Sequence, residues 1–285
     1  MPPAGYSLVW CDEFNAGESL TGDGSLWTFE EGGGGDGWGN NEAQFYCADG
    51  AITINGTSYK TAEVSSDGTL KIMATKLKGV PKSRKPNGCD YISARMNTKA
   101  SWQYGYIEMR AKLPVKEGCW SAFWMLPRYG SSYVRDSSMD GGELDILEHV
   151  PVDAEEQNKI YFSAHSYYTT KETYENDYAH YVDYIDPVTG THYGYSGNGT
   201  VSTPAEWHTY SMLWTGEFVR AFIDGEEYYY APNPYPGTVN LPYWGFNQEF
   251  YIKLNLAVGG DWGGTPASDF GTQTFEIDYV RVYQP

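Results

Sequence analysis

Three acidic residues lie within six positions of an otherwise apolar segment, which reads Gly-Gly-Glu-Leu-Asp-Ile-Leu-Glu-His-Val over residues 141–150. Successive side chains of a β-strand point to opposite faces, so a regular strand would put Glu143 and Asp145 on one face and Glu148 on the other. A one-residue bulge at Ile146-Leu147 would return Glu148 to the face of the other two acids, because a bulge inserts one unpaired residue. With such a bulge, the segment predicts a strand that carries all three carboxylates on one face.

Carboxylates in this arrangement allow two kinds of chemistry. Calcium takes about six to eight oxygen ligands, and the side chains of one strand cannot surround an ion in that way. The alternative is cleavage of a glycosidic bond, in which one carboxylate attacks the anomeric carbon and another protonates the leaving oxygen. The retaining form of this reaction needs carboxyl groups only ~5–5.5 Å apart, which Glu143 and Glu148 can reach from one strand face. Because Asp145 lies between them, we expect one carboxyl to keep its proton near neutral pH.

A solvated acidic strand without chemistry is the plain alternative. Leu144, Ile146 and Leu147 argue against it, since these apolar residues indicate that the strand is packed against a core. The acids are therefore interpreted as a site on a rigid strand.

The rest of the chain predicts an all-β protein. Sandwiches and barrels run to ~200–250 residues as one unit, so 285 residues suit a single domain over residues 1–285. Short strands recur about every 8–12 residues and are separated by Gly, Pro, Asn and Asp, a spacing typical of a sandwich. No long stretch has a helical period. The predicted strands include residues 52–54, 70–74, 91–96, 105–113, 119–127, 160–165, 207–214, 218–223, 250–258 and 275–283.

Three segments are predicted to be loops. Residues 30–41 are dense in glycine and carry Trp38, which would either lie against a ligand or pin the loop to the core. Residues 128–140 form a polar connection that leads into the acidic strand. Residues 167–203 are a Tyr- and Gly-rich excursion, and loops of that length are usually functional or mobile.

Composition limits the partners of the chain. Lys and Arg total 19 against 37 Asp and Glu, and the net charge of -18 would repel nucleic acid and acidic membrane surfaces. Aromatic residues make up 16% of the chain, which suits cross-strand pairs in sheets or stacking platforms for sugar rings. The sequence contains no run of ~18 apolar residues, so it predicts no membrane span.

Cysteine usage and the first residues bear on the compartment. The four cysteines, at 11, 47, 89 and 119, could form disulfides in three connectivities or remain buried free thiols, and they are too scattered for a zinc site. Met1-Pro2-Pro3 precedes the first strand without a basic and apolar leader, so if the protein is exported we expect its signal to have been removed.

The acidic motif at residues 143–148 resembles the signature of glycoside hydrolase family 16 in its bulged form, as in laminarinases. The resemblance runs from about residue 7 to 283. Other stretches similar to the family are residues 8–15, 37–42, 104–114, 120–127, 255–262 and 278–283.

The resemblance implies a β-sandwich jelly roll of two stacked antiparallel sheets, in which the concave sheet forms a substrate cleft. It implies a secreted, monomeric, retaining endo-β-glucanase that hydrolyses internal bonds of β-1,3-glucan or mixed-linkage β-1,3/1,4-glucan without a catalytic cofactor. The resemblance also implies that Glu143 is the nucleophile, that Glu148 is the general acid/base and that Asp145 assists them.

The resemblance also implies the residues that contact the sugar. Trp120 and Trp124 match aromatics beside the scissile bond, Arg95 matches a cleft arginine, and Asn41 matches a polar contact on the non-reducing side. His165 would face the cleft, with an ordinary hydrogen-bonded strand histidine as the alternative.

Many relatives bind a structural calcium ion, for which the candidates here are Glu13 and Asp278. Local salt bridges of these two acids are the alternative.

Some residues depart from the family pattern and leave the substrate open. Ser121 stands where laminarinases commonly carry proline, and the loops at residues 129–140 and between His165 and Trp207 are longer than expected. The alternatives are an endo-β-galactosidase of the same family acting on host O-glycans or keratan-like chains, a lectin-like glucan-binding protein without catalysis, and a transglycosylase.

Overall fold

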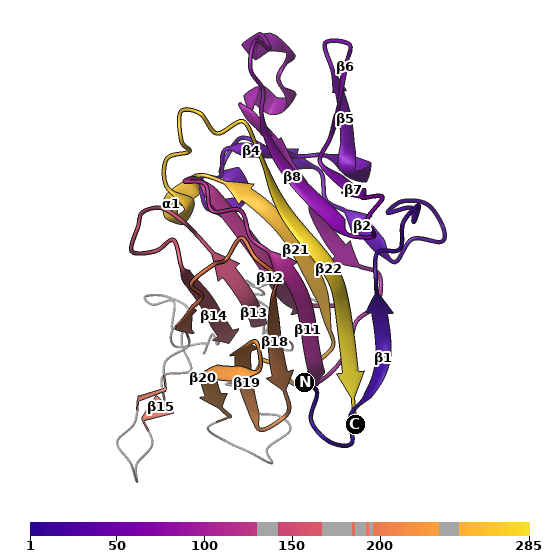
Figure 1. Cartoon of the computed structure of the whole chain (residues 1–285), viewed down its shortest axis with the longest axis vertical. Helices are drawn as coiled ribbons and strands as arrows, with labels where there is room; N and C mark the ends of the chain where they lie inside the picture. Colours follow the sequence, from indigo (N-terminus) through magenta and orange to yellow (C-terminus); the bar gives the residue numbers. More distant parts are fainter. Residues whose placement is uncertain (130–141, 167–183, 186–191, 194–195, 234–244) are drawn as a thin grey trace, which may run out of the picture.

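The computed structural model describes residues 1–129, 142–166, 184–185, 192–193, 196–233 and 245–285, and these residues form two large β-sheets. Figure 1 shows the sheets stacked face to face, with β22 and β11 of the larger sheet in front of β21 and β12 of the smaller one. All strand pairs in the two sheets are antiparallel except β4 and β9, which are parallel. The predicted sandwich of two stacked sheets is therefore confirmed, with this one parallel pair as an exception.

The larger sheet has the order β20-β19-β18-β11-β22-β8-β9-β4-β3, with β1 added on β22 and β7 on β8. Its strands are β1 (Ser7–Asp12), β3 (Gly32–Gly33), β4 (Gln44–Tyr46), β7 (Ala62–Val64), β8 (Leu70–Lys76), β9 (Tyr91–Ser93), β11 (Gly105–Lys112), β18 (His208–Trp214), β19 (Phe218–Ile223), β20 (Glu226–Pro232) and β22 (Thr272–Gln284).

The smaller sheet has the order β17-β14-β13-β12-β21-β10-β2. Its strands are β2 (Trp27–Phe29), β10 (Arg95–Thr98), β12 (Cys119–Pro127), β13 (Gly142–His149), β14 (Lys159–Ser166), β17 (Ser196–Thr200) and β21 (Phe250–Val258). Two hairpins stand apart, β5 (Ala51–Ile54) with β6 (Thr57–Lys60) and β15 (Tyr184–Ile185) with β16 (His192–Tyr193). The helical elements are α1 (Gly260–Gly263), η1 (Gly37–Gly39), η2 (Ala48–Gly50), η3 (Lys82–Arg84) and η4 (Pro86–Gly88).

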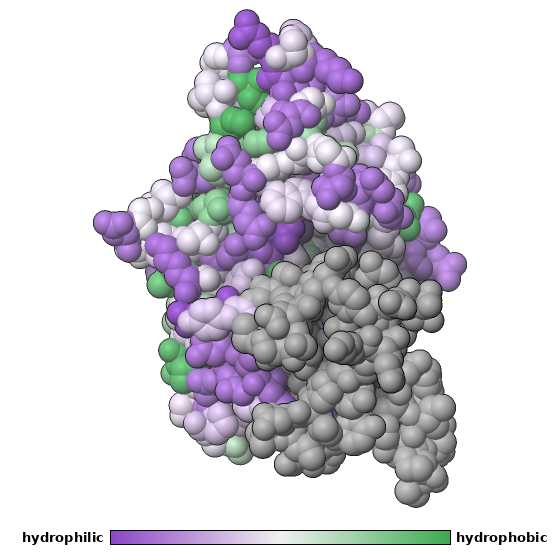
Figure 2. Space-filling view, turned by 180° about the vertical axis from the view of Figure 1, so that it is seen from behind, coloured by the Kyte–Doolittle hydropathy of each residue, from purple (hydrophilic) through white to green (hydrophobic). Residues whose placement is uncertain are grey.

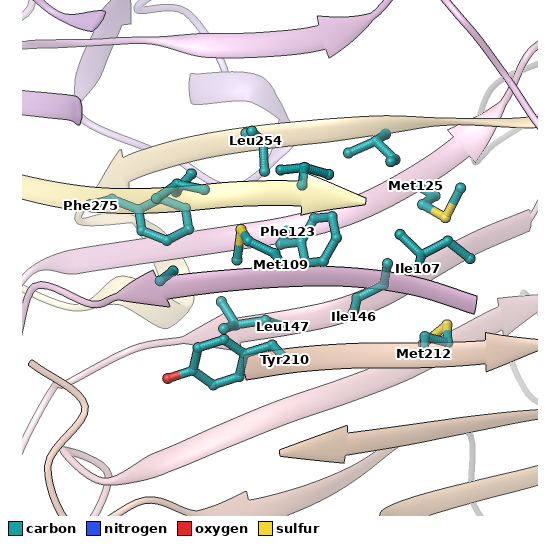
Figure 3. Packing of buried hydrophobic residues seen from close by; sticks show 14 of the residues in the cluster. Ile107, Met109, Phe123, Met125, Ile146, Leu147, Tyr210, Met212, Leu254 and Phe275 are labelled. Atoms are coloured by element: carbon teal, nitrogen blue, oxygen red, sulfur yellow. The ribbon is translucent and has the colours of Figure 1, made fainter. Parts of the chain in front are cut away.

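The core lies between the two sheets. Most of the long strands turn alternate apolar residues inward, and one cluster of buried side chains has members along the sequence from Phe14 to Val282. Figure 3 shows part of this cluster, with Phe123 of β12 and Met109 of β11 among its members. Each such side chain contributes about 1.5–3 kcal/mol through its removal from water.

The predicted strand at residues 91–96 is two strands in the structure. Its first half, β9, belongs to the larger sheet, and its second half, β10, belongs to the smaller one. The chain crosses between the sheets at Ala94, which is fully buried. The sequence does not reveal this crossing, because residues 91–96 contain no Gly, Pro, Asn or Asp that would mark a break between two strands.

The predicted loop at residues 167–203 contains an edge strand of the smaller sheet, β17, whose sequence Ser-Gly-Asn-Gly-Thr has little strand preference. A Cβ atom at Gly197 would come within 2.9 Å of the Tyr229 ring, and one at Gly199 within 2.7 Å of the Tyr228 ring. The glycines therefore allow β17 to lie close to β20. Most of the other residues of this loop, and most of the predicted loop at 128–140, lie outside the described residues.

The four cysteines are all free thiols, of which Cys47, Cys89 and Cys119 are buried. In the described part of the chain, no helix is both long and apolar enough to cross a lipid bilayer. Figure 2 shows the molecule from behind, where the described surface is mainly hydrophilic and hydrophobic side chains occur in small scattered groups.

Candidate active site

The bulge predicted in the acidic segment is present in β13. Phe123 of β12 pairs with Leu147 and Trp124 pairs with Asp145, so Ile146 has no partner on β12. The pairing with β14 shifts over the same residues. As a result Ile146 and Leu147 are both fully buried, and Figure 3 shows both within the core. The bulge thus turns two consecutive apolar side chains inward and returns the next residue to the outer face.

The three acids line one cavity of about 500 Å³ on the smaller sheet. Its floor consists of residues from the six neighbouring strands β10, β21, β12, β13, β14 and β17, and its walls come from the segment around η1 and from α1. The strand residues of the lining are Arg95, Trp120, Ala122, Trp124, Leu126, Glu143, Asp145, Glu148, Tyr161, Ser163, His165, Ser196, Asn255 and Ala257, and the wall residues include Trp38, Asn40, Glu42 and Trp262. The predicted cleft over the concave sheet is therefore confirmed.

The carboxylates are close together, with Asp145 buried and Glu143 and Glu148 partly exposed. Oxygen atoms of Glu143 and Asp145 and a ring nitrogen of His165 all lie within 4.8 Å of one another, and His165 Nε2 is 3.0 Å from Asp145 Oδ2. Burial raises the pKa of Glu143, of Asp145 and of Glu148, in each case to about 8. The charge of Asp145 adds to this effect at both glutamates. The cluster therefore shares protons near neutral pH, and its titration steps belong to the group as a whole.

Such a cluster can present an ionised carboxylate and a protonated carboxylic acid on one surface at the same pH. A carboxylic acid with a raised pKa can donate a proton, and an ionised neighbour can act as a nucleophile or base. Two acids and one imidazole offer too few oxygen ligands for a hard ion such as calcium. The donor set thus fits proton transfer and nucleophilic attack better than the binding of a hard metal.

The two predicted tryptophans are held by specific hydrogen bonds. Trp120 Nε1 donates to Glu148 Oε1 at 3.0 Å, and Trp124 Nε1 donates to Asn255 Oδ1 at 2.7 Å. Trp262 makes an edge contact with the Trp120 ring at 5.4 Å. Trp120 therefore both lines the cavity and contacts one of the acids.

Arg95 lies in the cavity lining between two aromatic rings. Its guanidinium carbon is 4.9 Å from the ring centre of Trp38 and 4.9 Å from that of Trp124. Trp38 also packs against Tyr46 at 5.4 Å. Trp38 therefore anchors its loop, and its place in the cavity lining leaves a contact with a ligand as a prediction.

The other two predicted contacts differ in position. His165 lies on the cavity-lining face of β14, opposite Glu143 in the strand pairing. Asn41 is exposed and donates to Asp261 Oδ1 at 2.9 Å, whereas the preceding Asn40 lines the cavity. A contact between Asn41 and substrate stays a prediction.

The two candidate calcium ligands form local salt bridges with arginines of the larger sheet. Arg281 donates to Glu13 through two nitrogens at 2.7 and 2.8 Å, and Arg110 Nη1 lies 2.6 Å from Asp278 Oδ2. Hydrogen bonds from Arg281 lower the pKa of Glu13 against the effect of burial. Because each carboxylate is already bound by a cation, this pair does not fit a calcium ion.

Several residues of the site were not predicted from the sequence. Glu42 and Trp262 line the cavity, and Lys253 lies next to it on β21 with 1% of its side chain exposed. Polar residues at 253 and 255 share one face of an otherwise apolar strand, and this alternation could have indicated the cavity side. No comparable local signal marks Glu42 or Trp262.

Comparison with known proteins agrees with this geometry. The sequence profile of "Glycosyl hydrolases family 16" matches residues 52–281. A "Beta-glucanase" from Rhodothermus marinus is 35% identical over 98% of this chain and 85% of its own length. "Glucan endo-1,3-beta-glucosidase A1" from Niallia circulans is 32% identical over 99% of this chain and 38% of its own length.

A solved structure extends the agreement to three dimensions. A variant of SCLam, described as a non-specific endo-beta-1,3(4)-glucanase and co-crystallised with 1,3-beta-D-cellotriosyl-glucose, has a TM-score of 0.75 and 32% identity. The match covers 100% of this chain and 97% of SCLam. On the family match, the identities and the shared fold, this chain belongs to glycosyl hydrolase family 16.

Proposed function

We propose that this chain is a retaining endo-β-glucanase that hydrolyses internal bonds of β-1,3-glucan or mixed-linkage β-1,3/1,4-glucan. The observation that carries the proposal is the bulged strand β13, from which Glu143, Asp145 and Glu148 line one cavity. The names of the relatives, a beta-glucanase and two endo-glucanases acting on β-1,3 linkages, support the substrate class.

The chemistry follows from two carboxyl groups with different protonation. Ionised Glu143 attacks the anomeric carbon and forms a glycosyl ester, while protonated Glu148 gives its proton to the leaving oxygen. Glu148, now ionised, takes a proton from water, whose oxygen attacks the ester and releases Glu143. Asp145 and His165 lie beside the nucleophile and position it through their charge and their contact at 3.0 Å.

The aromatic lining suits a flat-faced neutral sugar. Trp120, Trp124 and Arg95 offer ring faces and a planar cation along the cavity, and we assign them to substrate binding together with His165 and Asn41. The net charge of -18 favours a neutral glucan over a sulfated chain.

Reducing-sugar release tests the proposal on laminarin, barley β-glucan and a mucin or keratan-type glycan side by side. Release from either glucan is expected, with a mixture of short oligosaccharides from the start, because endo cleavage falls at internal bonds. Release from the galactose-containing glycan alone would identify an endo-β-galactosidase and overturn the proposal. Products longer than a defined starting oligosaccharide would instead identify transglycosylation.

A glucan-binding protein without catalysis is the alternative from another class. A pure binding surface gains nothing from crowding three acids together, one of which, Asp145, is buried with an unfavourable desolvation. Binding of laminarin without any release of sugar would support that alternative.

We further propose a single catalytic domain over residues 1–285 and a secreted monomer. The core cluster, with members from Phe14 to Val282, supports the single domain, and the scattered hydrophobic side chains on the described part of the face in Figure 2 support the monomer. Light scattering tests the oligomeric state. Because Glu13 and Asp278 are bound by arginines, we expect no structural calcium at these two residues, and EDTA should leave the melting temperature unchanged.

A further inference from the structure

Lys253 of β21 is a buried charge beside the cavity. Only 1% of its side chain is exposed, and its ammonium group contacts the Glu30 carboxylate and donates to Asn97 Oδ1 at 2.7 Å. The same group lies 5.2 Å from the ring centres of Trp124 and Tyr251. Burial lowers the pKa of Lys253 to about 8. An ammonium in such a position is unfavourable unless other groups need it there.

Glu30 joins this lysine to the arginine of the cavity lining. Its Oε1 accepts from Lys253 and from Asn97 Nδ2 at 2.8 Å, and its Oε2 lies 3.0 Å from Arg95 Nε. Burial opposes the ionised form of Glu30, but the Arg95 and Lys253 cations outweigh burial and lower the Glu30 pKa. One carboxylate thus holds two cations, and the group has a net charge of plus one.

This group lies beside the acids of β13. Trp124 is the cross-strand neighbour of Asp145 on one side and of Lys253 on the other. Two strand spacings separate Lys253 from the acidic strand, which is about 10 Å. The charge of Glu143 raises the pKa of Lys253, although burial of the lysine lowers it more. Likewise Arg95 lowers the pKa of Glu143, although burial of the glutamate raises it more. The cations beside Glu30 and the acids of β13 therefore interact electrostatically.

We propose that Glu30, Arg95 and Lys253 form a positioning cluster whose surplus positive charge favours the ionised form of Glu143 and whose ring contacts fix Trp124 beside it. The inference rests on the proposed function, because it takes Glu143 as the nucleophile. Lys253 and Glu30 do not line the cavity, so they act through Arg95, Trp124 and Glu143 rather than on the substrate. The charged and titratable groups that face Lys253 and Glu143 in the described chain are Glu30, Arg95, Tyr251, Asp145, His165 and Glu148.

A set of charge variants separates electrostatics from packing. Lys253→Met removes the surplus charge, and Lys253→Arg keeps it. The double variant Glu30→Gln with Lys253→Met removes one anion and one cation and so restores a net charge of plus one. Lys71→Met is a matched control, since this lysine of the larger sheet pairs with Glu276 at 3.9 Å and lies outside the cavity lining.

The measurement is the pH dependence of kcat/KM on laminarin for each variant. A unit charge at about 10 Å, with an effective dielectric constant of about 20, changes the titration of a carboxyl by about one pH unit. In the profile of kcat/KM against pH, the acid limb of Lys253→Met is therefore expected about one pH unit higher than that of the wild type. The limbs of Lys253→Arg, of the double variant and of Lys71→Met should stay at the wild-type position.

An acid limb of Lys253→Met that does not move would overturn the inference, even if the variant is less stable or slower at every pH. Wild-type protein without activity on any glucan would overturn the proposed function instead. Carbon-13 NMR titration of the glutamate carboxyls in the free protein then tests the cluster without substrate, with the same displacement expected for Glu143. If Lys253→Met fails to fold, Lys253→Gln makes the same charge change with a side chain that can still bond Glu30.

Discussion

The hydrogen bond from Trp120 to Glu148 allows a prediction with a defined sign and size. Its Nε1 donates to Glu148 Oε1 at 3.0 Å, and this bond lowers the Glu148 pKa against the stronger effect of burial. Trp120→Phe keeps an aromatic ring but removes the donor, so the ionised form of Glu148 loses its partner. A hydrogen bond to a charged group contributes about 1.5–3 kcal/mol, which corresponds to roughly one to two pH units.

The expected result is a displacement of the basic limb of kcat/KM. Glu148 must be protonated to act as the acid, and the variant keeps this proton to higher pH, so the limb should move upward by about one to two units. Trp124→Phe is the matched control, because its Nε1 donates to the neutral Asn255 and not to an acid. Both variants should raise KM through lost ring area. A basic limb of kcat/KM that stays in place in Trp120→Phe would refute the reasoning, and so would an equal displacement in both variants. In either case Glu148 is not the acid, or the hydrogen bond from Trp120 does not act on it.

Two further substitutions in β13 test the site and its support. Glu143→Gln should lower kcat by roughly 10³-fold or more while laminarin binding by calorimetry stays within a few-fold, and an active variant would refute the nucleophile. The same variant should melt at a higher temperature than the wild type at pH 8. The difference in melting temperature between variant and wild type should shrink toward pH 4. The reason is that the raised Glu143 pKa makes the stability of the wild type fall as pH rises from 4.5 to about 8, and the glutamine of the variant does not titrate. Ile146→Ala should lower the free energy of unfolding by about 2–5 kcal/mol in urea titrations, and a much smaller loss would mean that the bulge residue is not packed as the structure has it.

The strands and the acidic site could be predicted because their signals are local. Alternation of apolar and polar residues marks the core-facing Ile107, Met109 and Ala111 in β11, and it marks Phe275 with Ile277 and Val280 with Val282 in β22. In the same way, three acids among apolar residues mark β13 within a window of six positions. Such patterns need no knowledge of which strands are neighbours in the sheet.

The parts that the sequence did not predict depend on contacts between distant segments. The crossing at Ala94 requires knowing that two sheets meet there, and β17 requires knowing that tyrosines of β20 face its glycines. Glu30 and Lys253 are separated by 223 positions, so neither neighbourhood indicates the other. The resemblance favours Asn41 for substrate contact, whereas the turn at η1 determines that Asn40 lines the cavity.

The bulge of β13 follows from physical chemistry as well as from resemblance. In a regular strand, Leu147 would share the cavity face with Glu143 and Asp145, and Glu148 would enter the core between the sheets. Exposing Leu147 would lose about 1.5–3 kcal/mol, and burying an unpaired carboxylate among apolar side chains would lose several kcal/mol more. A bulge avoids both losses and leaves only the backbone of Ile146 without a partner on β12, while the Ile146 side chain adds to the core. The apolar residues therefore determine where Glu148 points, and the geometry of the site is a consequence of how the strand packs.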